Sequence, residues 1–221
     1  DGGSNDPTGD IPFFNTVETG LEMSLIFPRF LIPIGQQRFP KYFRPKTTIR
    51  AGYGYDRRPE YTRSPLYFTF GYDWKESEYK RHIINPFDWN IVEVDLSPEF
   101  QQEIDDEPND RIRNQYTDNL ITAITYSFIF NNQDLNRLQN FVYCRGNAET
   151  GGNLLQAGHL LFGTRPDSLD DYTIRDIRYS QYARMDIDFR YYNVITRNQT
   201  VVYRLYAGMG IPYGNASVLP L

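Results

Sequence analysis

Histidine and cysteine, the side chains that most often serve as catalytic bases, nucleophiles and metal ligands, are rare in this chain. The 221 residues include two histidines, His82 and His159, and one cysteine, Cys144. A Ser-His-Asp or Cys-His system needs an imidazole beside a nucleophile, and neither histidine lies in a recognisable motif of that kind. One cysteine forms no internal disulfide, and these three residues make a poor zinc site. The sequence therefore predicts no catalytic residues, no metal site and no cofactor.

Two further motifs resemble ligand-binding loops only in part. The acidic run Glu103–Asp110 could supply oxygen ligands to calcium, but it lacks the alternating ligands and the central glycine of an EF-hand loop. The run Gly208–Gly214 follows a predicted strand, but its glycine spacing differs from that of a dinucleotide-binding turn. We therefore interpret the acidic run as a solvated loop, and expect Gly208 and Gly210 to leave space for another segment of the chain.

Composition narrows the class of protein. The chain carries 23 Lys and Arg against 28 Asp and Glu, a formal charge of −5, and contains no basic cluster of the kind that nucleic-acid binding requires. Its mean hydropathy is −0.59, and no stretch approaches the about 20 apolar residues of a membrane-spanning helix. The 18 tyrosines and 15 phenylalanines suit surfaces that are apolar on one side and wet on the other.

Alternation of apolar and polar residues with period two recurs along the whole chain, which is typical of strands with two different faces. The sequence predicts about eight such strands of roughly 9–12 residues, at Val17–Phe27, Thr48–Asp56, Leu66–Trp74, Phe87–Leu96, Leu120–Phe130, Leu138–Ala148, Gln181–Tyr192 and Val201–Ile211. The acidic segment Ser97–Asn119 is predicted to be a long loop with one helical turn. The glycine-rich segment Thr150–Gly163 fits a short helix or a kinked strand.

The two faces of these strands differ in a way that favours a membrane barrel. A soluble sandwich has strands nearer about 5–6 residues, whereas a tilted crossing of a bilayer takes about 9–11 residues with an apolar exterior and a polar lumen. We therefore predict an all-β, antiparallel transmembrane β-barrel. Its lumen-facing residues are expected to be Arg184, Asp186, Asp188, Arg190 and Arg204. Aromatic residues near strand ends are expected to form interfacial girdles: Tyr53, Tyr55, Tyr72, Trp74, Trp89 and Tyr191.

The run Tyr203–Asn215, followed by Leu219 and Pro220, resembles the last strand before a long loop in the BamA/TamA family of outer-membrane assembly proteins. More closely, it is similar to the Bacteroidetes branch of that family, the TamL or surface-antigen proteins. Other segments of the chain agree with this resemblance: Phe27–Phe30, Tyr53–Pro59, Phe70–Lys75 and Tyr126–Phe128.

The resemblance implies that residues 1–221 form part of a barrel of roughly 16 strands, without the POTRA domains, the remaining strands or the lateral gate. It implies space-making roles for Gly208 and Gly210, and a loop that folds back into the lumen toward an Arg-Gly motif beyond Leu221. That loop is launched by Pro212, Tyr213, Gly214, Asn215, Leu219 and Pro220. The implied function is non-enzymatic: insertion of β-barrel proteins into the bacterial outer membrane, or translocation across it. The implied partners are outer-membrane lipid, unfolded outer-membrane proteins and accessory proteins of the outer membrane or periplasm.

Three alternatives remain open from the residues alone. The strand count also fits a complete small porin or lipid-binding barrel, and the tyrosine content fits a soluble carbohydrate-binding sandwich. The sandwich requires Leu21, Phe68, Ile187 and Leu205 to face a core. The third alternative is the barrel half of a patatin-like hydrolase fusion, whose enzymatic residues would precede this chain.

Overall fold

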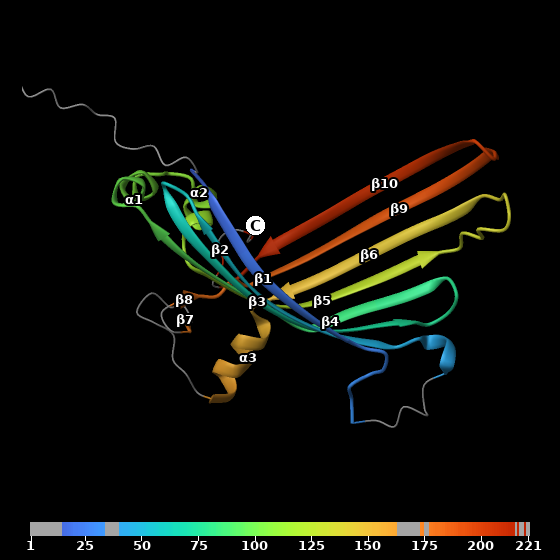
Figure 1. Ribbon diagram of the computed structural model, residues 1–221, viewed down its shortest axis with the longest axis horizontal. Helices are drawn as coiled ribbons and strands as arrows, with labels where there is room; N and C mark the ends of the chain where they lie inside the picture. The colour runs from blue at the N-terminus through green and yellow to red at the C-terminus, as the bar shows by residue number, and fades with distance from the viewer. Residues whose placement is uncertain are drawn as a thin grey trace, which may run out of the picture.

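Most of the chain belongs to one antiparallel sheet of eight strands (Figure 1). The computed structural model describes residues 15–33, 40–162, 173–174, 177–214, 216 and 219. The strands of the sheet are β1 (Val17–Phe27), β2 (Lys46–Arg57), β3 (Tyr61–Lys75), β4 (Lys80–Leu96), β5 (Asn119–Asn131), β6 (Phe141–Gly151), β9 (Tyr182–Thr196) and β10 (Gln199–Pro212). A separate hairpin pairs β7 (Thr173–Ile174) with β8 (Ile177–Arg178).

Strand order in the sheet follows chain order, β1-β2-β3-β4-β5-β6-β9-β10, and every pairing is antiparallel. The prediction of an all-β, antiparallel fold with about eight strands is confirmed. Several strands are longer than predicted, up to the 17 residues of β4, because pairing continues beyond the predicted alternating segment, in β4 as far as Lys80. The sheet is not closed, so β1 and β10 form its two edges.

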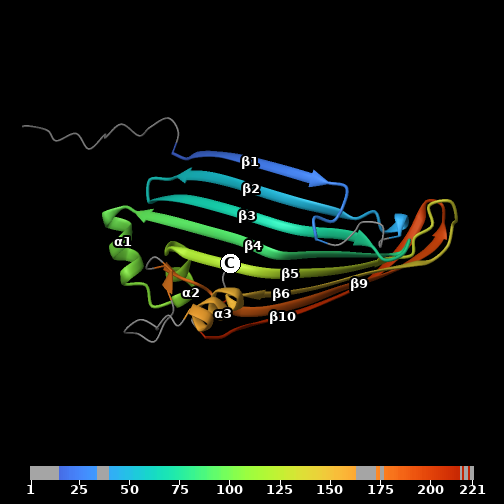
Figure 2. The same cartoon turned by 90° about the horizontal axis from the view of Figure 1, so that it is seen from below.

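The connections differ between the two ends of the sheet (Figure 2). At one end lie α1 (Pro98–Asp105), α2 (Asp110–Arg113) and α3 (Asn153–Phe162), together with β7 and β8. At the other end lie the tight turns of the β3–β4 and β9–β10 hairpins and the short helix η2 (Lys41–Phe43). No helix among the residues described is both long and apolar enough to cross a membrane.

The β4–β5 connection is more helical than predicted, since it contains α1, α2 and η3 (Asn114–Tyr116) in place of one helical turn. Ser97 caps α1 by accepting a hydrogen bond from the Phe100 backbone N–H, and Pro98 occupies the first turn, where its missing N–H costs nothing. The Phe100 ring packs against Tyr61 of β3 and Tyr116 of η3. These aromatic contacts hold the connection over the end of the sheet.

The segment Thr150–Gly163, for which the sequence fits a short helix or a kinked strand, forms the short helix α3 in the β6–β9 connection. Gly152 starts the connection with a φ of 76°, and its N–H donates to the Thr122 carbonyl at 2.8 Å. The returning chain reaches the same strand again, where the Ser180 N–H donates to the Leu120 carbonyl at 3.2 Å. The first residues of β5 are thus covered by this connection, beyond the point where β6 stops pairing with them.

Few side chains are fully buried, and most of them gather under this connection. Among the described residues the buried hydrophobic ones are Phe30, Ile104, Leu120, Ala123, Tyr179 and Tyr182. Four of these lie at the start of β5 or at the end of the β6–β9 connection. The small core therefore fixes one end of the sheet, while the long strands extend away from it with both faces largely uncovered.

Candidate functional site

One face of the sheet is lined by exposed apolar side chains. The register places Leu205 of β10 opposite Phe189 of β9, and Leu21 of β1 opposite Tyr53 of β2, so the same alternation continues across the sheet. Leu205 is 65% exposed and Leu21 is 78% exposed. We call this surface the apolar face, and define it by Leu21, Met23, Leu25, Tyr53, Leu66, Phe68, Trp89, Tyr126, Met185, Ile187, Phe189, Leu205 and Met209.

The opposite face, which we call the polar face, carries side chains that hydrogen-bond across neighbouring strands. On this face Arg184 of β9 donates to Glu149 of β6 from Nε at 3.0 Å and from Nη2 at 2.8 Å. Asn147 of β6 donates to Asp186 at 2.7 Å, and Ser127 of β5 donates to Asn147 at 2.7 Å. Charged and amide groups thus satisfy one another across β5, β6 and β9.

Asp188 is the centre of the densest charge cluster on the polar face. Its two carboxylate oxygens accept from Arg190 at 3.0 and 2.6 Å and from Arg204 at 3.0 and 2.9 Å. Asp188 is only 7% exposed, because both guanidinium groups cover it. Each guanidinium also lies over an aromatic ring, Arg190 over Tyr143 and Arg204 over Tyr206. Bidentate pairing of this kind fixes the register of β9 against β10.

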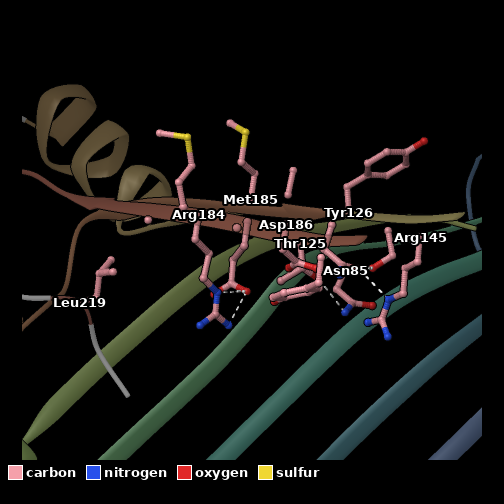
Figure 3. Close-up of a pocket in the computed structure, with 16 residues that line it drawn as sticks. Asn85, Thr125, Tyr126, Arg145, Arg184, Met185, Asp186 and Leu219 are labelled. Carbon is pink, nitrogen blue, oxygen red and sulfur yellow. Dashed lines mark hydrogen bonds and ion pairs between the residues drawn. The ribbon is translucent and has the colours of Figure 1, made fainter. Parts of the chain in front are cut away.

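The polar face contains a hollow of about 630 Å³ in front of β5, β6, β9 and β10. Figure 3 shows Asn85, Arg145 and Arg184 reaching into it, while Tyr126 and Met185 point to the other side of the same sheet. Both signs of charge line the hollow, as does the hydroxyl-bearing Tyr206. Such a lining suits water and polar chain segments rather than an apolar ligand.

Gly208 and Gly210 face this hollow at the end of β10, and the chain returns over one of them. A Cβ at Gly210 would lie 2.7 Å from Cδ1 of Leu219, so the absence of a side chain allows Leu219 to pack there. A Cβ at Gly208 would lie 3.2 Å from the Cβ of Asp186. The loop after β10 therefore begins by folding toward the polar face.

The first residues of that loop are tied to the β6–β9 connection. Pro212 ends β10 opposite Tyr182, and the Tyr213 N–H donates to the Gln181 carbonyl at 3.0 Å. The Tyr213 hydroxyl donates to Asn153 Oδ1 at 3.0 Å. Gly214 has a φ of 57°, a conformation that favours glycine. Two residues of the predicted loop motif, Asn215 and Pro220, lie outside the described residues.

Replacing Gly210 with alanine is expected to lower stability by about 1 kcal/mol, because the new methyl group displaces the end of the partly exposed Leu219 side chain. In a Leu219→Ala background the same change should cost less than about 0.5 kcal/mol, since the overlapping atoms are gone. Urea unfolding of the unchanged protein, the two single variants and the double variant measures the coupling. Equal costs in both backgrounds would contradict the packing of Leu219 on Gly210.

The two tryptophans, Trp74 and Trp89, differ in their distance from the ends of their strands. Trp74 lies near the end of β3 and stacks on His82 of β4, with ring centroids 5.0 Å apart. Trp89, in contrast, lies in the middle of β4, so its expected place near a strand end is wrong. Pairing of β4 continues to Lys80 on one side and Leu96 on the other, which leaves Trp89 far from both ends.

His82 is held in a structural network. Its Nε2 lies 3.1 Å from Glu76 Oε2, and its Nδ1 lies 2.8 Å from the Tyr126 hydroxyl. An ionised carboxylate only accepts, so Nε2 donates to Glu76. Cys144 is a free thiol on β6, and the side chain of His159 lies outside the described residues. No three His, Cys, Asp or Glu side chains in the described ranges come together as a metal site.

The Glu76 network predicts a dependence of stability on pH. Hydrogen bonding to His82, assisted by the charge of Lys80, lowers the pKa of Glu76, which lies in the β3–β4 turn. Because the pKa of Glu76 is lower in the folded protein, its carboxylate stabilises the fold at pH values above the pKa in the unfolded chain, about 4.3. This stabilisation is lost as the pH falls through the lower pKa of the folded protein. We expect Glu76→Gln to reduce the loss of thermal stability between about pH 5 and pH 3. Glu78→Gln, in the same turn, is the matched control and should leave that loss unchanged.

Sequence reasoning missed several polar-face residues of β6. The missed polar residues are Arg145, Asn147 and Glu149, which alternate with the small residues Cys144, Gly146 and Ala148. The alternation has the period of a strand, but it is weak because these small residues are barely apolar. Comparison of the chain with protein-family models and with curated protein sequences finds no match. Function is therefore inferred from the two faces of the sheet and from the motif at the end of β10.

Proposed function

We propose that this chain is part of an outer-membrane β-barrel that inserts β-barrel proteins into the bacterial outer membrane or passes proteins across it. The observation that carries the proposal is the inverted polarity of the sheet. Exposed apolar side chains line one face on seven of the eight strands, and β6 adds the small residues Cys144, Gly146 and Ala148 there, whereas polar side chains bond to one another on the opposite face.

The apolar face supports a lipid environment. Exposed apolar residues on seven strands of one sheet are typical of a surface that contacts lipid or a partner rather than water. A carbohydrate-binding sandwich would bury Leu21, Phe68, Ile187 and Leu205 beneath a second sheet. Each of these four residues is exposed, and no second sheet covers them in the described part of the chain. In a bilayer the same residues face acyl chains and the polar face lines a watery lumen.

The open edges of the sheet support an assembly role. Because strands in lipid must satisfy all their backbone hydrogen bonds, β1 and β10 need further strands beside them to close a barrel. The proposed barrel has roughly 16 strands, of which this sheet supplies eight. A seam that opens in such a barrel offers a strand edge, and an incoming chain can pair with it before it meets lipid. Polar side chains and the loop after β10 occupy the lumen in this proposal, and no covalent step is needed.

Two measurements test the proposal with the full-length protein. The protein should stay in the membrane pellet after alkaline carbonate washing, and release without detergent would contradict a membrane barrel. Proteoliposomes containing it should fold an added unfolded outer-membrane barrel protein faster than empty vesicles do. Solute leakage without faster folding would favour the porin reading instead.

A further inference from the structure

Over residues 153–157 of helix α3, the polar side chains of Asn153 and Gln156 bond to the protein, while Leu154 and Ala157 are exposed. Asn153 donates to Thr150 Oγ1 and accepts from the Tyr213 hydroxyl at 3.0 Å. Gln156, three residues later, accepts from Gln181 Nε2 at 2.8 Å. Gln181 is itself 1% exposed, so this contact lies inside the small core at the end of the sheet.

Two apolar residues in the described part of α3 are exposed on its other side. Leu154 is 40% exposed, and Ala157, three residues on and thus on the same side, is also exposed. The ten residues of the helix, NLLQAGHLLF, include no Asp, Glu, Lys or Arg. A helix on the surface of a water-soluble protein has the reverse arrangement, with apolar residues toward the core and charged residues outward.

The position of α3 continues the apolar face. The Thr150 hydroxyl accepts a hydrogen bond from Asn153 of α3. Thr150 pairs with Ile124 of β5 and with Ala183 of β9. Because Tyr126 and Met185 follow two residues later on these strands, they lie on the same side of the sheet as Thr150. Figure 3 shows the helix on the side to which Tyr126 and Met185 point, away from the hollow. Figure 2 places it at the same end of the sheet as α1 and α2. The exposed side of α3 therefore borders the surface that we assign to lipid.

We propose that α3 is an interfacial helix that lies in the headgroup layer of the bilayer, with Leu154 and Ala157 in contact with lipid. This inference rests on the proposed function, because it requires the apolar face to be embedded. A helix of ten residues is about 15 Å long, too short to span the bilayer but sufficient to lie along its surface. Interfacial helices reach about 5–10 Å into the boundary between headgroups and acyl chains.

Such a helix would link the lipid surface to the loop after β10. The Tyr213 hydroxyl donates a hydrogen bond to Asn153 of α3. The Tyr213 N–H donates to the carbonyl of Gln181, the residue immediately before β9. Helix α3 is thus joined directly to the first residue of the loop by one hydrogen bond, between the Tyr213 hydroxyl and Asn153.

Fluorescence quenching in vesicles tests this placement. The full-length protein, with Cys144 and every cysteine outside residues 1–221 replaced by alanine, receives one polarity-sensitive fluorophore at Leu154→Cys, Leu205→Cys or Glu103→Cys. Leu205 reports on the centre of the apolar face, and Glu103, exposed on α1, reports on water. The variants are reconstituted in phosphatidylcholine vesicles whose lipids carry bromine either next to the headgroup or at mid-chain. Bromine quenches only fluorophores at its own depth.

The expected result is stronger quenching of the Leu154 label by headgroup-proximal bromine than by mid-chain bromine, with the opposite order at Leu205 and none at Glu103. Quenching at Leu205 but not at Leu154 would overturn the interfacial helix and leave the membrane barrel standing. Deeper quenching at Leu154 by mid-chain bromine would also overturn the interfacial placement. Absence of quenching at both Leu154 and Leu205 would overturn the proposed function together with this inference.

Discussion

Replacing Leu205 with arginine should destabilise the membrane-inserted protein by about 2–4 kcal/mol, the cost of a cation on the lipid side of a barrel near mid-bilayer. Leu205 is 65% exposed, and in water such a substitution would change stability by less than about 0.5 kcal/mol. The size of the effect thus depends on what surrounds the apolar face, and the substitution separates a lipid environment from an aqueous one.

The next residue in β10 offers a matched control. Tyr206 is 60% exposed, but the alternation of the strand places it on the polar face, opposite Asp188 of β9. Tyr206→Arg introduces the same charge one position away and should cost far less than Leu205→Arg. Reversible urea unfolding in phospholipid vesicles measures both. Similar small effects for the two variants would contradict the membrane assignment of the apolar face.

The second large effect is expected at Gly152, which starts the β6–β9 connection. Its φ of 76° is strained for a residue with a side chain, at about 1–2 kcal/mol. A Cβ there would lie 2.6 Å from Gln181 Cγ and 2.7 Å from the Ser180 carbonyl oxygen. Overlap of this kind costs about 1–3 kcal/mol more. Gly152→Ala should therefore lower the free energy of unfolding by about 2–5 kcal/mol.

Gly158, inside α3, provides the control for Gly152. A Cβ at Gly158 meets no atom within 4 Å, and alanine favours a helix over glycine by about 0.5–1 kcal/mol. Gly158→Ala is thus expected to stabilise the protein slightly. Urea unfolding, with proteolysis of the β6–β9 connection as a local readout, compares the variants. Equal stability of Gly152→Ala and the unchanged protein would show that the connection does not pack on Gln181 as described.

The alternating residues of the sequence predict the sheet well. For β1 the predicted and observed ranges coincide, and in β9 and β10 the alternation assigns Arg184, Asp188 and Arg204 to one face. The signal is strong there because apolar and charged residues follow one another without interruption. For β6 it is weaker, and the strand begins at Phe141 rather than at Leu138.

Contacts between distant segments could not be predicted from the pattern. Thr150–Gly163 has no clear period, and its helical part is held by Gln181 and Tyr213, both far along the chain. The partners of Asp188 are also partly nonlocal, since Arg204 reaches it only when β9 and β10 pair in the observed register. Tertiary contacts of this kind decide between local alternatives that have similar intrinsic preferences.

The order of the strands also bears on how the chain folds. Because each strand of the sheet pairs with the one before it, the sheet can grow by zipping neighbouring segments together, without crossing connections. The β9–β10 hairpin has the shortest loop to close, whereas β6 and β9 must meet across the long segment 152–181. Hairpin formation at β9–β10 is therefore expected to precede docking onto β6, and the α3 connection sets the slower step that joins the two parts of the sheet.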